Sequence, residues 1–161
     1  MKLFSTEFQD FRFLNKKHEF NSFGGDGENH SPALNWQDAP AETKSFAITC
    51  YDPDAPTGSG FWHWVAFDIP TTVTALAVNA GAQSSENMPA GSIQSINDYG
   101  LAGFGGACPP EGHGPHRYIF NVHALSVEKL GIDASATNAV ARFMIEGHTL
   151  AKASVTGLYE R

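Results

Sequence analysis

Three short apolar segments, each bounded by proline or glycine, most constrain what this chain can fold into. Each is rich in β-branched and aromatic residues, and each is too short for a typical helix, so we predict three β-strands. In the third segment the apolar residues alternate with polar ones, which would place every second side chain on one buried face. The three segments are Ser45–Tyr51, His63–Ile69 and Tyr118–Ala124.

Weaker patterns complete the expected fold. Ala33–Trp36 and Ser154–Tyr159 are further strand candidates, and one helix is predicted from about Ser135 to Gly147. Ala139, Val140, Phe143 and Met144 would form the apolar face of this helix. Long Gly/Pro-rich loops are expected at Gly24–Pro32 and Gly100–Pro115. The chain of 161 residues therefore fits one mostly-β domain covering residues 1–161, with long binding loops.

Charge and the chain ends limit the possible partners and location. With 17 Asp and Glu against 10 Lys and Arg, the net charge is −7, which argues against nucleic acid. The N-terminus has no apolar signal segment, and no run of residues is long enough for a transmembrane span. We therefore expect a cytoplasmic protein in which Cys50 and Cys108 are reduced thiols.

The first candidate for chemistry is Asp52-Pro53-Asp54-Ala55-Pro56, directly after a predicted strand. Two prolines make this corner rigid, so it can hold a carboxylate in a fixed place beside a cleft. A plain turn, in which an Asp caps its own backbone, explains the same residues. A metal site of the D-x-D type is a third and weaker alternative.

A second candidate is His63, which lies between Trp62 and Trp64 at the start of a predicted strand. It is either a core histidine or part of a pocket wall. Only a Gly-rich turn separates this strand from the first corner, so Asp52 and His63 can face one cleft. A carboxylate beside an imidazole orients the ring and favours its protonated form, which is a good receptor for anions.

The third candidate is the rigid loop from Cys108 and Pro109 to His116, Arg117 and Tyr118. Residues at i and i+2 of a strand share a face, so His116 and Tyr118 can form one wall while Arg117 points away. Zinc is disfavoured, because the pair His113 and His116 lacks further ligands at suitable spacing. A nucleophilic cysteine is also disfavoured, because nothing in the sequence lowers the pKa of the Cys108 thiol.

Together these motifs resemble the phosphatidylethanolamine-binding protein (PEBP) family, and most closely its bacterial Raf-kinase-inhibitor-like branch of the YbhB/YbcL type. The resemblance rests on D-P-D-A-P, on the His at the opening of the next strand, and on Gly-x-His-Arg-Tyr, in that order. Further matches cover essentially the whole chain; they are Asn29–Trp36, Asn97–Gly100 and Gly105–Pro110.

The resemblance implies a Greek-key β-sandwich, with a large antiparallel sheet packed on a smaller one, and a cis peptide bond at Ala55-Pro56. It implies a non-catalytic protein without a cofactor that binds phosphate or a phosphorylated head group in a small pocket. A kinase or protease inhibitor that docks through the pocket rim, a homodimer, and an uncharacterised hydrolase stay open as alternatives. The implied pocket and rim residues are Asp52, Trp62, His63, Cys108, Pro109, His116 and Tyr118, with Asp54, Pro56 and Arg117 as structural residues of the motifs.

Overall fold

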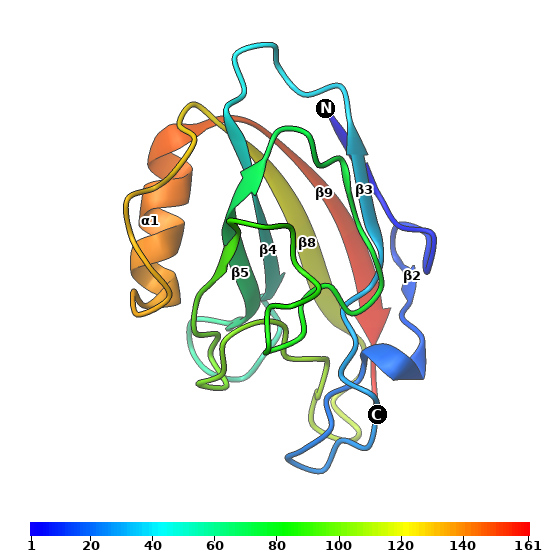
Figure 1. The fold of residues 1–161 in the computed structure, drawn as a ribbon. Helices are drawn as coiled ribbons and strands as arrows, with labels where there is room; N and C mark the ends of the chain where they lie inside the picture. The colour runs from blue at the N-terminus through cyan, green and yellow to red at the C-terminus, as the bar shows by residue number, and fades with distance from the viewer.

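A six-stranded sheet forms the centre of the computed structural model, which describes residues 1–161 (Figure 1). Its strand order is β2-β9-β8-β4-β5-β7, and a second sheet has the order β1-β3-β6. The bounds in the large sheet are β2 Arg12–Phe13, β4 Ser45–Asp52, β5 Phe61–Pro70, β7 Ile93–Gln94, β8 His116–Leu125 and β9 Thr149–Tyr159. Those in the small sheet are β1 Lys2–Phe4, β3 Leu34–Gln37 and β6 Ala75–Leu76. A 3-10 turn, η1, covers Lys16–His18, and the α-helix α1 covers Asn138–His148.

The connections of the large sheet form a Greek key. Strands β4, β5 and β7 lie side by side and antiparallel, and β8 then returns to pair antiparallel with β4. This spatial order, with the fourth strand beside the first, defines the motif. The predicted Greek-key β-sandwich and all five predicted strands are therefore confirmed. The large sheet is not wholly antiparallel as expected, because the short edge strand β2 pairs parallel with β9.

The two faces of the large sheet bury different cores. Strand β8 shows the predicted alternation, with every second side chain from Tyr118 to Ala124 buried in the core between the two sheets. The opposite face packs against α1 through a smaller core that includes Ala47, Val65 and Ile145. Alternate residues of one strand therefore serve two separate environments.

Helix α1 matches its predicted position, but its predicted buried face is wrong. Thr137 caps the helix by accepting a hydrogen bond from the Val140 backbone N–H. Ala141 and Ile145 face the sheet, whereas Phe143 is 78% exposed. The small Ala141 side chain lets the helix approach the sheet closely. This close packing, and not the number of apolar residues on a face, decides which face of the helix is buried.

A β-bulge in β5 aims His63 toward one end of the sheet. Trp64 pairs with Cys50 and Trp62 pairs with Tyr51, so His63 is an extra residue without a partner on β4. Such bulges redirect side chains next to functional sites. Trp62 consequently faces the α1 side, where it stacks on Tyr51.

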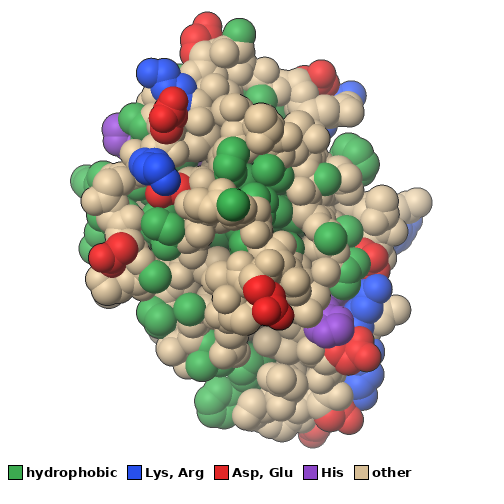
Figure 2. All heavy atoms as spheres, in the orientation of Figure 1, with side chains coloured by type: hydrophobic (Ala, Val, Ile, Leu, Met, Phe, Trp, Pro, Cys, Tyr) green, Lys and Arg blue, Asp and Glu red, His purple; other side chains and the backbone are tan.

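The long loops gather at one end of the large sheet, near the C-terminus (Figure 1). The two predicted Gly/Pro-rich loops meet there, since the Asn29 side chain donates to the Phe104 carbonyl and accepts from the Gly106 backbone N–H. On the face shown in Figure 2, Lys and Arg side chains lie scattered among acidic and uncharged ones and form no continuous basic patch. None of the helices has the length and apolar character needed to cross a bilayer.

Candidate functional site

A cavity of about 190 Å³ lies at the loop end of the large sheet. Six of the seven residues predicted from the sequence to bind a ligand line it: Asp52, His63, Cys108, Pro109, His116 and Tyr118. Pro56, predicted as part of a structural motif, also lines it. The rigid D-P-D-A-P corner and the loop before β8 therefore form two sides of one cavity, as the motifs predicted.

Trp62 does not line this cavity. The bulge at His63 turns the Trp62 ring to the other face of the sheet, and the neighbouring Phe61 occupies the cavity wall. Phe61 packs its ring against that of His63, with the two ring centres 4.9 Å apart. The structure therefore places Phe61, and not Trp62 as the resemblance implied, beside His63 at the cavity.

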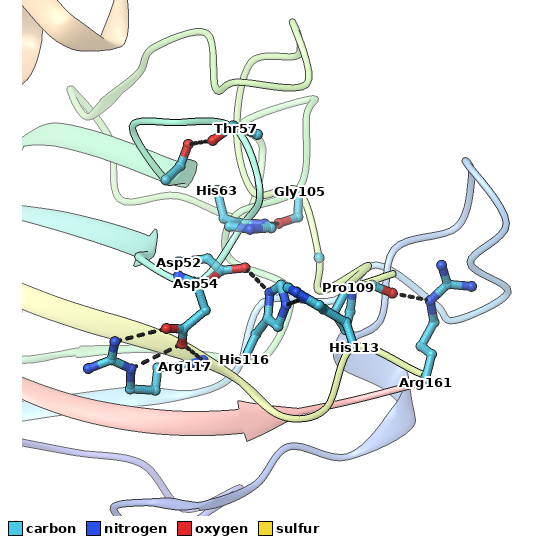
Figure 3. Close-up of polar contacts among 12 residues, drawn as sticks. Asp52, Asp54, Thr57, His63, Gly105, Pro109, His113, His116, Arg117 and Arg161 are labelled. Carbon is cyan, nitrogen blue, oxygen red and sulfur yellow. Dashed lines mark hydrogen bonds and ion pairs between the residues drawn. The ribbon is translucent and has the colours of Figure 1, made fainter. Parts of the chain in front are cut away.

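A chain of three polar side chains runs from the buried base of the cavity to its surface (Figure 3). The Asp52 carboxylate lies 2.7 Å from Nδ1 of His116, and both residues are buried. On the other side of the ring, Nε2 of His116 lies 2.6 Å from Nδ1 of His113, which is exposed. Since an ionised carboxylate only accepts, Nδ1 of His116 donates to Asp52, and Nε2 is left to face outward.

The second oxygen of Asp52 is also engaged. It accepts a hydrogen bond of 2.8 Å from the backbone N–H of Asp54, which fixes the carboxylate within its own turn. Asp52 thus orients His116, whereas the sequence left open whether it would orient His63 instead.

His63 is held by the backbone of the opposite loop. Its Nδ1 lies 2.7 Å from the carbonyl oxygen of Gly105, so Nδ1–H donates and the other ring nitrogen, Nε2, carries a lone pair when the ring is neutral. Burial lowers the pKa of His63, against the opposing effects of the Gly105 carbonyl and of Asp52. The expected rise in the pKa of this histidine is therefore wrong, because burial outweighs the carboxylate.

Tyr118 brings a hydroxyl group without a partner to the cavity. The residue is 2% exposed, and its hydroxyl oxygen is buried and makes no hydrogen bond. Burial raises the pKa of the phenol well above its usual range, so the hydroxyl keeps its proton and can donate. A buried polar group without a partner is costly, and in a cavity wall it indicates a place for a ligand.

Asp54 and Arg117, both expected to be structural residues of the motifs, fix the corner to strand β8 through a pairing that the motifs did not indicate. Asp54 accepts two hydrogen bonds from the Arg117 guanidinium, of 2.8 and 3.0 Å, and a third from its backbone N–H (Figure 3). This pairing lowers the pKa of Asp54. The cis peptide bond expected at Ala55-Pro56 is absent, since every peptide bond is trans. The corner keeps its shape instead through the hydrogen bonds of its two carboxylates.

The outer rim carries Cys108, Pro109 and the C-terminal Arg161. Both cysteines of the chain are free thiols, and burial raises the pKa of Cys108. Arg161 donates 2.8 Å from Nε to the Pro109 carbonyl and 3.1 Å from a terminal nitrogen to that of Gly24. It therefore ties both long loops together at the rim.

Comparisons with known proteins show the family to which the chain belongs. A family model described as phosphatidylethanolamine-binding protein matches residues 4–160. The chain belongs to this family. The YbcL protein of Escherichia coli (strain K12) is 48% identical over 97% of this chain and 85% of its own length. YbhB of the same organism is 47% identical over 99% of both chains. The chain therefore falls in the YbhB/YbcL branch, as its motifs indicated.

Solved structures of relatives have the same fold. The crystal structure of E. coli YbcL, described as a new member of the mammalian PEBP family, superposes with a TM-score of 0.97 at 47% identity. That match covers 99% of this chain and 98% of YbcL. A PEBP homologue from Chlamydia trachomatis D/UW-3/CX has a TM-score of 0.80 at 27% identity, over 99% of this chain and 97% of its own.

Sequence reasoning did not assign several residues to the site. The cavity is also lined by Ala55, Thr57, Phe61, Tyr99 and Pro110, and its lining residues are contacted from outside by His113 and Arg161. The Tyr99 hydroxyl donates to the Gly106 carbonyl at 2.8 Å and so shapes the wall opposite the corner. The positions of Tyr99 and Arg161 depend on contacts between distant loops, which leave no local pattern. The bulge hid Phe61, whereas His113 was visible as a second His three residues before His116.

Proposed function

We propose that the cavity binds the singly protonated phosphate group of a small phosphomonoester such as phosphoethanolamine, the free head group of a phospholipid, without catalysing a reaction. The Tyr118 hydroxyl carries this proposal, because it is buried, protonated and without a partner at the cavity wall. A phosphate oxygen would supply the missing acceptor. The proposal accords with the description of the family as phosphatidylethanolamine-binding.

The hydrogen-bonding groups of the cavity match a phosphate that keeps one proton. Neutral His63 presents an acceptor at Nε2, which favours a ligand O–H, while Tyr118 presents a donor. His116 presents its Nε2 to the same ligand once His113 has moved aside. A fully deprotonated anion would leave the His63 acceptor without a partner.

Binding without catalysis is supported by the state of the possible nucleophiles. The pKa of the Cys108 thiol is raised by burial, so little reactive thiolate forms near neutral pH. Asp52 already accepts hydrogen bonds on both oxygens and so is committed to orienting His116. A screen with ester and phosphoester substrates that finds turnover dependent on His63 would contradict this part of the proposal.

Tyr118→Phe tests the proposal directly, because it removes only the unpartnered hydroxyl. We expect phosphate and phosphoethanolamine to bind about 10- to 100-fold more weakly, since one hydrogen bond to an anion is worth about 1.5–3 kcal/mol. The free variant should be as stable as the wild type or more so, because a buried polar group without a partner is gone. Histidine NMR shifts would follow binding, and urea unfolding would follow stability.

The pH dependence supplies a second test. A phosphomonoester loses its second proton with a pKa of about 6. Phosphoethanolamine affinity should therefore fall as the pH rises from about 5 to 8, while sulfate, which carries no proton in this range, should bind weakly at every pH. Equal affinity for Tyr118→Phe and wild type, or stronger binding of sulfate than of phosphate, would refute the proposal.

A further inference from the structure

A second cavity, of about 160 Å³, lies between helix α1 and the opposite face of the large sheet. Its wall includes Trp62 from β5, His123 from β8, Arg142 and Glu146 from α1, and Lys152 from β9. None of these residues lines the first cavity. The proposed phosphate site therefore leaves this group of polar side chains unexplained.

His123 presents a buried acceptor to this second cavity. The residue is 2% exposed, and its Nδ1 lies 3.1 Å from Oγ1 of Thr149. The Thr149 hydroxyl itself donates to the Ile145 carbonyl at 2.7 Å, so its oxygen accepts and Nδ1 of His123 donates. The other nitrogen, Nε2, then carries a lone pair; it makes no hydrogen bond and is not sealed from the cavity. Burial lowers the pKa of His123 to about 4, so the ring is neutral at pH 7.

Arg142 presents uncommitted donors. Its Nε donates to the Asn138 side chain at 3.1 Å, and the guanidinium lies over the Trp62 ring, 4.0 Å from the ring centre. The two terminal nitrogens make no hydrogen bond to the protein. A guanidinium held flat on an indole is well placed to bind a planar carboxylate through both terminal nitrogens.

The charges around the cavity suit a ligand with one negative charge. Arg142 and Lys152 are positive and Glu146 is negative, with 3.7 Å between the Lys152 ammonium and the Glu146 carboxylate. Asp98 also attracts Arg142 but does not line the cavity. Its two oxygens accept from the Trp62 backbone and the Asn138 side chain. The excess of one positive charge in the lining favours a carboxylate over a doubly charged phosphate.

We propose that the second cavity binds a small hydroxycarboxylate. Its carboxylate would bind Arg142 and Lys152, its hydroxyl would donate to Nε2 of His123, and its carbon skeleton would pack on Trp62. Trp62, His123 and Lys152 come from three strands of the sheet, and Arg142 comes from α1, which packs on the same face. This site is separate from the proposed phosphate site and does not depend on it.

A titration with L-lactate, followed by NMR of the histidine and indole signals, tests the proposal. We expect the His123 and Trp62 signals to shift and saturate, and the His63 and His116 signals to stay unchanged. Arg142→Gln should weaken lactate binding about tenfold or more, because it removes a charge-assisted pair of hydrogen bonds. Lys152→Gln, at an exposed side chain, should weaken it about threefold without disturbing the helix. Lys2→Gln removes an equal charge from the small sheet and should leave binding unchanged.

Propionate, which lacks the hydroxyl, separates the role of His123 in binding the hydroxyl from the role of Arg142 and Lys152 in binding the carboxylate. We expect it to bind about fivefold more weakly than lactate, which corresponds to one neutral hydrogen bond. Equal binding of propionate and lactate would overturn the role given to His123. Wild-type affinity in Arg142→Gln and Lys152→Gln, or no saturable shift at His123, would overturn the site. Phosphate should shift His63 and His116 but not His123, so this site and the phosphate site can fail separately.

Discussion

Strands β4, β5 and β8 contribute side chains to both cavities, but the two cavities differ in how their polar side chains are held in place. Strand β8 supplies His116 to the first cavity and His123 to the second, and β5 supplies His63 and Trp62 in the same way. In the first cavity, hydrogen bonds from buried groups fix the Asp52 carboxylate and both histidine rings. In the second, hydrogen bonds hold His123 and the Nε of Arg142, but the terminal nitrogens of Arg142 and the ammonium of Lys152 lie at the ends of long side chains from α1 and β9.

This difference concerns preorganisation. A group already fixed in its binding position loses little entropy when a ligand arrives, whereas a long exposed side chain loses rotamer freedom. The first cavity should therefore bind more tightly and tolerate fewer substitutions than the second. Both depend on strand alternation, and the bulge at His63 determines which residues of β5 face which cavity.

Removal of the Asp52 carboxylate should produce the largest effect and sharpen the contrast. In Asp52→Ala the buried Nδ1–H of His116 and the Asp54 backbone N–H both lose their acceptor. Each unsatisfied buried donor costs about 1–3 kcal/mol, so we expect the free energy of unfolding to fall by about 2–5 kcal/mol. Phosphate binding should be lost as well. Urea unfolding and phosphate titration would measure the two effects.

Glu146→Gln is the matched change in the second cavity. Its carboxylate is largely exposed and lies 3.7 Å from the Lys152 ammonium, so the free energy of unfolding should fall by less than about 1 kcal/mol. Equal losses in the two variants would contradict the difference in preorganisation.

The sequence predicted the fold and most of the first cavity because both depend on local patterns. Alternation located β8, and prolines around two carboxylates located the corner that carries Asp52. The bulge escaped prediction, because an extra residue in one strand depends on pairing with its neighbour, and this misplaced Trp62. The second cavity was not predicted, since it forms only where α1 packs on the sheet, and the sequence indicated the wrong face of that helix.

Acidification should test whether both cavities rest on neutral histidines. Burial lowers the pKa of His63 and lowers that of His123 to about 4, against an ordinary value of 6.5. Above about pH 6.5 neither folded nor unfolded chain is protonated at these rings. Below it the unfolded chain takes up protons that the folded chain resists, so stability falls as the pH decreases.

Through His123 alone, the free energy of unfolding should decrease by about 3 kcal/mol between neutral pH and about pH 4. Urea unfolding at several pH values would measure it. His123→Gln should flatten the acid side of the stability curve by about that amount. A curve as steep as that of the wild type would mean that His123 is not held neutral, and the comparison between the two cavities would fail on this point.

Removal of the His113 side chain should have the smallest effect, and it would show whether this residue competes with the phosphate or binds it. Its Nδ1 occupies the Nε2 side of His116, 2.6 Å away, at the position that a phosphate oxygen would take. The ligand must break this contact before it binds, so His113→Ala should raise phosphate affinity about fivefold, the equivalent of one hydrogen bond. Lactate binding at the second cavity should not change, because His113 does not line that cavity. A fall in phosphate affinity would show that His113 binds the ligand directly. The loop before β8 would then complete the first cavity when the ligand binds, and the cavity would not be fully formed beforehand.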